Sequence, residues 1–267
     1  MMRSPLASHR APDVGWVRQV SVPRTFREPG IQLYPGVHAI GPSRRGWGQG
    51  GYSRAYLFED GDDLTLVDTL WDEDARMILA YLASIGRRPQ EITRIAMTHA
   101  HRSHLGGLAT IKRLSGAPVY SHAAEAPIIA GEQPAAKIPL RPLAPWQLVP
   151  FRVASQLGLQ PHVGCPVDHP DLVEGSVLGG LKVLHLPGHT PGNLAFSWDD
   201  DKVLAVADTI MTWPEPLVAG WPNFNQDDDV FAESLERVLE RNPKVVGTGH
   251  GDPIWENTAR RISTLAP

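Results

Sequence analysis

The chain has 267 residues, 42% of them hydrophobic and 20% charged, which is enough for a large core and excludes a disordered chain or a miniature scaffold. The net charge of −4, with no long basic run, argues against holding a nucleic acid by charge alone. The single cysteine, Cys165, excludes an intramolecular disulfide, a thiolate zinc cage and a paired-thiol redox site.

Residues 1–30 are rich in arginine and proline and predict an irregular N-terminal arm. They contain no continuous apolar stretch of the kind found in a signal peptide, and no run of about 18 apolar residues follows. We therefore expect a soluble, cytoplasmic protein with no membrane partner.

The segment from residue 31 to 131 predicts strands that give way to alternating strands and helices. Its predicted strands cover 33–40, 54–60, 64–69, 92–98 and 118–121, and its predicted helices cover 72–86, 104–114 and 122–131. The turn at Asp60-Gly61-Asp62 indicates antiparallel pairing of the strands on either side. Residues 131–170 then contain eight prolines, which deny long regular elements, and predict an insertion or lid.

The segment after the insertion predicts a second sheet followed by helices. Strand patterns cover 176–188, 193–200, 202–209 and 244–249, with helices at 227–242 and from about Trp255. No linker or shift in composition divides the chain, so we expect an α/β fold with one domain over 31–267.

Three histidines lie within six residues, His99, His101 and His104, between a predicted strand and a predicted helix. This spacing lets imidazoles converge on one or two metal ions. His189, Asp208 and His250 each follow a further predicted strand, where a rigid scaffold can bring them together. Each alone is explained as a turn residue or helix cap, but the set favours a metal site.

These residues resemble the metallo-β-lactamase superfamily, whose motif is His-x-His-x-Asp-His followed by a single His, a single Asp and a last His. The resemblance covers roughly residues 31–260. It implies an αββα sandwich of two mixed sheets flanked by helices. It implies that one metal is held by His99, His101 and His189, that a second is held by His104 and His250, and that Asp208 bridges the two and orients the attacking hydroxide. It also suggests that Asp68 orients a ligating histidine, although a strand-to-helix cap explains Asp68 equally well.

Ser103 stands where the superfamily motif has aspartate. A neutral hydroxyl is a poor ligand for a divalent cation, so the second site is weakened. His104, Asp208 and His250 still supply three protein ligands, the number in an ordinary catalytic zinc site. Alternatively, Ser103 caps a helix that begins at His104.

We expect a metal-dependent hydrolase that uses a metal-bound hydroxide, and the resemblance implies that the small-molecule substrate has an ester, thioester, lactone, lactam or phosphoester bond. Zinc, one or two ions, is the expected cofactor, with iron or manganese as alternatives. A second hypothesis is a mononuclear iron enzyme resembling the persulfide dioxygenases of the same superfamily, and a third is a metal-poor member without catalysis. Metal content distinguishes the three.

Other segments give weaker signals. A predicted strand follows the glycines of GWGQGG (46–51), so a dinucleotide site is not expected there. We expect the loop at 41–54 to lie over the metal site, together with the insertion. His162, Cys165, Asp168 and His169 have no recognised metal-binding spacing and are left unassigned. Trp47, Trp146 and Phe151 favour a small, partly apolar substrate. A homodimer through the arm or insertion stays open, and no nucleic-acid partner is expected.

Overall fold

The structure is a computed structural model and describes residues 29–42, 52–137, 139, 149–158, 162–214, 216–221 and 224–266. The arm over 1–28, the loop at 43–51, Trp47 and Trp146 lie outside the described residues, as does the side chain of Phe151.

The first sheet has six strands in chain order: β1 (Gly30–Tyr34), β2 (Val37–Ile40), β3 (Ala55–Asp60), β4 (Asp63–Val67), β5 (Ile92–Ala96) and β6 (Val119–Tyr120). The strands from β1 to β4 pair antiparallel, whereas β4, β5 and β6 pair parallel, so the sheet is mixed. The predicted strand at 33–40 is therefore a hairpin that turns at Pro35-Gly36, where glycine adopts a φ of 73°.

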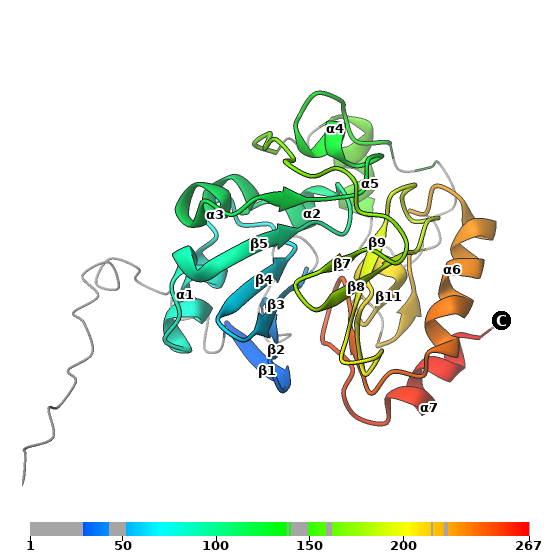
Figure 1. Cartoon of the computed structure of the whole chain (residues 1–267). Coiled ribbons are helices and arrows are strands. Elements are labelled where there is room, and N and C mark those ends of the chain that lie inside the picture. The colour runs from blue at the N-terminus through cyan, green and yellow to red at the C-terminus, as the bar shows by residue number, and fades with distance from the viewer. Residues whose placement is uncertain are drawn as a thin grey trace, which may run out of the picture.

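Alternation of side chains along β3 gives this sheet two buried faces. Ala55 and Leu57 pack on the outer face with residues of α1 (Arg76–Ser84) and α3 (Leu108–Ser115). Tyr56 and Phe58 point instead to the interior between the sheets. The outer helices are blue-green in Figure 1 and cover this side of the sheet.

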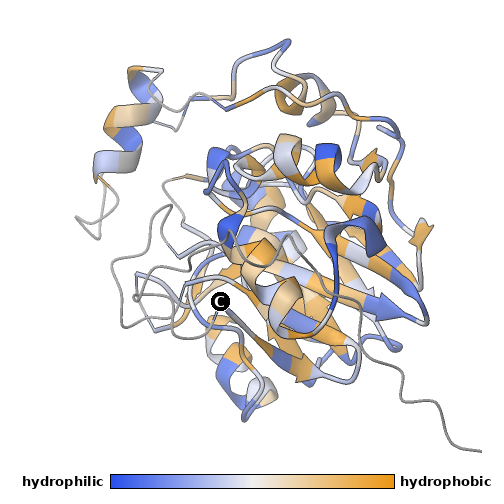
Figure 2. Cartoon of the chain, turned by 90° about the vertical axis from the view of Figure 1, so that its left-hand side faces the viewer, coloured by the Kyte–Doolittle hydropathy of each residue, from blue (hydrophilic) through white to orange (hydrophobic). Residues whose placement is uncertain are grey.

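The second sheet has the order β13-β10-β9-β8-β7 and stacks its inner face on the first sheet (Figure 1). Its strands are β7 (Val177–Leu178), β8 (Leu181–His185), β9 (Leu194–Trp198), β10 (Val203–Ala205) and β13 (Val245–Gly247). Its outer face is covered by α6 (Asp228–Glu240) and α7 (Thr258–Ile262). Helices, sheet, sheet and helices make four layers, which confirms the αββα sandwich. Figure 2 shows the apolar residues gathered where these layers meet.

Short elements complete the described chain. They are the 3₁₀ helices at Pro89–Glu91, Ala207–Thr209 and Ser263–Leu265, the strands β11 (Ile210–Met211) and β12 (Val218–Ala219), and the helices α2 (Arg102–Leu105), α4 (Ala126–Ile129) and α5 (Val149–Gln156). No helix among the described residues combines the length and apolar character needed to cross a membrane.

Several expectations about helices were wrong in detail, and the helix expected at 122–131 covers only Ala126–Ile129. The helix expected at 72–86 begins only at Arg76, because the Asp72 carboxylate accepts the backbone N–H of Arg76 ahead of the first turn. The helix expected at 104–114 is two helices, because the backbone N–H groups of Gly106 and Gly107 donate to the carbonyls of Leu70 and Thr69 instead of to helical carbonyls. The insertion contains the helix α5, in which Pro150 occupies the second position, where no intrahelical N–H bond is lost.

Candidate metal centre

The expected site residues meet at one edge of the sandwich because they follow strands that end there. Asp68 follows β4, His99 and His101 follow β5, and His189 follows β8. Asp208 lies in the 3₁₀ turn after β10, and His250 follows β13, the parallel neighbour of β10. Each sheet therefore contributes side chains to the same place.

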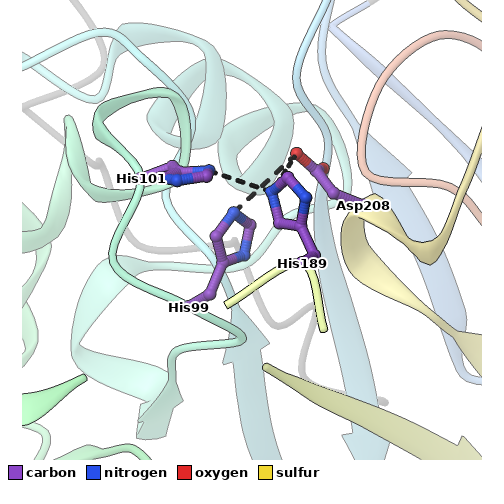
Figure 3. A group of neighbouring side chains, drawn as sticks. All are labelled: His99, His101, His189 and Asp208. Carbon is purple, nitrogen blue, oxygen red and sulfur yellow. Dashed lines mark hydrogen bonds and ion pairs between the residues drawn. The ribbon is translucent and has the colours of Figure 1, made fainter. Parts of the chain in front are cut away.

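The first donor group consists of His99, His101, His189 and Asp208 (Figure 3). Nε2 of His189 lies 3.3 Å from Oδ2 of Asp208 and 3.0 Å from Nδ1 of His101. Nε2 of His99 lies 3.8 Å from the same Asp208 oxygen. One donor atom from each side chain thus faces a common centre.

The second donor group consists of His104, Asp208 and His250. Nε2 of His104 lies 3.3 Å from Oδ1 of Asp208, and Nε2 of His250 lies 3.5 Å from Oδ2. Within each of the two groups the candidate donor atoms lie within 4.8 Å of one another. Asp208 belongs to both groups, so its carboxylate can bridge two ions.

Hydrogen bonds fix which nitrogen of each ring faces inward. Nδ1 of His104 donates to Oδ2 of Asp68 at 2.8 Å. The Thr98 hydroxyl donates its proton to the same oxygen at 2.8 Å and therefore accepts from Nδ1 of His99 at 2.9 Å. Asp68 thus orients one histidine of each donor group, directly or through Thr98. The alternative role of Asp68 as a helix cap is wrong, because the next helix begins at Arg76.

His189 is oriented from the opposite side of the site. Its Nδ1 donates to Oδ1 of Asn225 at 3.1 Å, which leaves the lone pair of Nε2 directed at Asp208. Asn225 is buried, so its amide has little freedom to turn away.

Burial and charge give the two donor groups different electrostatic character. Burial, helped by the neighbouring His189, lowers the pKa of His101 to about 3, and burial likewise holds the pKa of His99 well below its usual value.

Burial also acts to lower the pKa of His104, but the carboxylates of Asp68 and Asp208 outweigh it and raise that pKa to about 10. Burial acts to raise the pKa of Asp208, yet His250 and His104 hold it well below its usual value. His99 and His101 are therefore neutral and ready to bind a cation beside the ionised Asp208, whereas His104 must release a proton from Nε2 before it can act as a ligand.

The buried polar atoms of the site fit a metal ion. Nε2 of His99, Nε2 of His104 and Oδ1 of Asp208 are buried without a hydrogen-bond donor or acceptor of their own. Such atoms are costly unless something satisfies them, and a cation coordinated by them does so. The nitrogen and carboxylate donors suit zinc and also iron or manganese.

Ser103 lies inside α2, whose N-terminal cap is His101, so the expected helix-capping role is wrong. Its side chain lines one pocket together with His101, Asp208 and His250. The position beside the second donor group therefore carries a neutral hydroxyl where a carboxylate would add a negative charge.

The insertion contributes to the rim of this pocket. Ala135, Ala136, Ser155 and His162 line it, which agrees with the expected placement of the insertion over the site. The other residues of the unassigned cluster lie elsewhere: Asp168 pairs with Lys112, His169 stacks on Tyr120, and Cys165 belongs to the core beneath α3. The described residues of this cluster form no further candidate metal group.

An aromatic wall beside His250 was not expected. Trp221 lies 4.8 Å from the His250 ring, centroid to centroid, and packs on Phe224 and Trp213. Trp221 and Phe224 line the pocket, and Trp71 lines it as well. These residues give the pocket an apolar wall.

Several supporting residues escaped the sequence analysis. Nothing near Thr98 or Asn225 in the sequence marks their roles. Thr98 bonds to Asp68 and Asn225 bonds to His189, both far away along the chain, and the contact of Thr98 with His99 depends on the orientation of the histidine ring. Gly249 did have a sequence signal, because it directly precedes His250 in GHG. In the structure, a Cβ at this position would lie 1.9 Å from Oδ1 of Asp208. Only glycine lets the two strand ends approach so closely.

Comparison with known proteins gives one matching family profile, described as the metallo-beta-lactamase superfamily, over residues 48–250. The matched range contains all six candidate ligands.

Individual relatives are distant. The probable metallo-hydrolase YflN of Bacillus subtilis (strain 168) is 29% identical over 180 residues, which cover 61% of this chain and 66% of that protein. Hydroxyacylglutathione hydrolase of Rhodopseudomonas palustris (strain BisB18) is 30% identical over 159 residues, covering 59% of this chain and 48% of that protein. The chain thus spans about two thirds of the first relative and about half of the second.

A solved structure also matches. TTHA1623, crystallised in a di-iron-bound form, is 29% identical, with a TM-score of 0.55 over 76% of this chain and 90% of that chain.

Proposed function

Because the chain belongs to the metallo-β-lactamase superfamily and is a hydrolase of that fold, we propose that it hydrolyses an acyl bond of a small molecule with one or two metal ions held by the two donor groups. The observation that carries the proposal is the shared position of Asp208, buried between five histidines whose donor atoms face it.

The proposed first ion is held by His99, His101 and His189, and the proposed second by His104 and His250, with Asp208 between them. A bound divalent ion lowers the pKa of a water molecule toward about 7 and polarises a carbonyl oxygen. Oδ1 of Asp208 makes no hydrogen bond in the described structure, so it can accept one from the attacking water and set the direction of its lone pair. Asp68 keeps the Nδ1 proton of His104 in place, so that Nε2 stays a donor to the ion.

Thioesters are the first substrates to test among esters, thioesters, lactones, lactams and phosphoesters. Hydroxyacylglutathione hydrolase, the relative with 30% identity, bears a name that describes thioester cleavage. The pocket walls at Trp71, Trp221 and Phe224 favour a small substrate with an apolar part.

The testing experiment measures metal content and hydrolysis together. Elemental analysis of the purified chain is expected to give one or two zinc ions, and a panel of small thioesters, lactones, lactams and phosphoesters is expected to reveal metal-dependent turnover that a chelator removes. His189→Ala is expected to lose both metal and turnover, because no thiolate is available to replace the imidazole. Stoichiometric metal in His189→Ala would contradict the ligand assignment.

A second candidate is an iron enzyme of the persulfide-dioxygenase kind. TTHA1623 was crystallised in a di-iron-bound form, which makes iron a metal to test here. Ser103 brings no negative charge to the second donor group, which favours occupation of the first group alone. One iron per chain, together with oxygen uptake on a persulfide and no hydrolysis, would favour this candidate over the first. A chain that holds no metal and turns over neither substrate would support a non-catalytic role.

A further inference from the structure

Glu125 is a buried carboxylate that joins the two loops carrying the first donor group. It lies at the start of α4 and is 1% exposed. Its Oε2 accepts the backbone N–H of Ala100 at 2.9 Å, and its Oε1 accepts the backbone N–H of Gly192 at 2.9 Å. Both oxygens are therefore engaged, each by a different loop.

The two loops belong to different sheets. Ala100 lies between His99 and His101 in the loop that follows β5 of the first sheet. Gly192 lies three residues after His189, in the connection from β8 to β9 of the second sheet. One further backbone bond joins the same loops, from the N–H of Leu194 to the carbonyl of Thr98 at 2.9 Å, but it lies on the far side of His99 from Ala100.

The contact at Gly192 is too close for a larger residue. A Cβ at this position would lie 2.7 Å from Cγ of Glu125 and 2.8 Å from its Oε1, and also 2.8 Å from Nδ1 of His122. Gly192 thus lets the β8–β9 loop approach the carboxylate closely, and the short bond depends on the absence of a side chain.

We infer that Glu125 is a positioning residue that sets the spacing between His99 and His101 on one loop and His189 on the other. This inference rests on the proposed function, since it concerns the three imidazoles proposed to hold the first ion. The hydrogen bonds of the Glu125 carboxylate go to the backbone N–H groups of Ala100 and Gly192, so it acts through the backbone that carries the candidate ligands.

The two hydrogen bonds require two acceptor oxygens, which a carboxylate offers and an amide does not. Two converging N–H groups need two acceptor oxygens, and a glutamine offers one oxygen and one NH₂. Glu125→Gln therefore sets an N–H donor against an N–H donor at one of the two loops, at nearly unchanged volume. Aspartate is one methylene shorter and cannot span both loops from the same backbone position.

The experiment measures metal binding by the full chain with Glu125→Gln. Zinc affinity is measured by competition with a chromophoric chelator, the visible spectrum of the cobalt(II)-loaded protein reports ligand geometry, and thermal unfolding of the metal-free protein reports folding. The matched control is Asp168→Asn, which also converts a carboxylate that accepts a backbone N–H, that of Val119, but joins no ligand loop.

The expected result is zinc affinity about 10- to 100-fold weaker, as for loss of other supporting partners of metal ligands, with an altered cobalt spectrum. Asp168→Asn is expected to keep the parent affinity and spectrum. If Glu125→Gln fails to fold, Gly192→Ala displaces the same carboxylate from the other side and is expected to weaken zinc in the same way.

Unchanged affinity and spectrum in the folded variant would overturn the inference while leaving the proposed function intact. A parent chain that binds neither zinc nor cobalt would refute both, and it would do so before any variant is compared.

Discussion

Replacing Gly249 by alanine is expected to disrupt both donor groups at once. The added Cβ would lie 1.9 Å from Oδ1 of Asp208, 2.6 Å from the carbonyl carbon of Ala207 and 2.8 Å from its oxygen. Ordinary van der Waals contact begins at 3.4 Å, so the carboxylate or the turn must move by about 3.4 − 1.9 = 1.5 Å.

The size of this displacement sets the expected effect. Metal and catalytic sites tolerate about 0.5 Å of error in the position of their ligands, and Asp208 serves both groups. We therefore expect zinc affinity to fall by at least about 100-fold. Overpacking a close backbone contact also costs about 1–3 kcal/mol of unfolding free energy, which lowers the melting temperature of the metal-free protein by several degrees.

Chelator competition and thermal unfolding of the metal-free protein measure the two effects separately. Gly30→Ala is the control, because its Cβ would lie 2.6 Å from the carbonyl oxygen of Ala39, far along the first sheet from the candidate ligands. It is expected to lower stability and spare zinc affinity. If Gly249→Ala binds zinc as tightly as the parent, the close approach to Asp208 does not position this ligand and the reasoning is refuted.

Three further outcomes are expected. Ser103→Asp adds an anionic oxygen beside the second donor group and raises affinity for a second zinc about 10- to 100-fold; a titration that finds no added binding would show that this is not the vacant ligand position. Asp68→Asn replaces the oxygen that accepts from His104 or Thr98 by a donor, and lowers zinc affinity about 10-fold or more, measured against the parent by the same competition. Asp168→Asn tests a pH dependence. Burial acts to raise the pKa of Asp168, but the Lys112 ammonium and the Val119 N–H outweigh it and lower that pKa. The ionised carboxylate therefore stabilises the folded protein above the ordinary carboxyl pKa, and this stabilisation is lost as the pH falls through the lowered pKa. The side chain is 40% exposed, so the difference in unfolding free energy at pH 7 is at most about 1 kcal/mol, and urea unfolding should show a smaller difference at pH 3 than at pH 7.

The α/β class and the second sheet could be predicted from the strand and helix patterns, whereas the αββα sandwich was implied by the family resemblance. The strands β8, β9 and β10 are short, strongly apolar and bounded by glycine or aspartate turns, and His189 and Asp208 follow directly. Local pattern therefore indicated which side chains converge, while their binding of a metal stays a prediction.

The misplaced elements depend on contacts that sequence distance hides. The break between α2 and α3 comes with hydrogen bonds from the N–H groups of Gly106 and Gly107 to the distant carbonyls of Leu70 and Thr69, which the helical pattern of the sequence does not indicate. Asn225 and Glu125 escaped for the same reason. Each is an isolated polar residue whose partners, His189 for one and Ala100 and Gly192 for the other, are brought near only by folding.

The candidate ligands come from both sheets, His99, His101 and His104 from the first and His189, Asp208 and His250 from the second. An ion that binds them is a crosslink between the two halves of the chain, closing the loop from His99 to His189 in the first donor group or from His104 to His250 in the second. Folding is then linked to metal supply by mass action, with about 2.7 kcal/mol of added stability when free metal exceeds its dissociation constant 100-fold. The survival of the folded chain under protease would consequently track the free metal concentration around it, independently of whether any substrate is present.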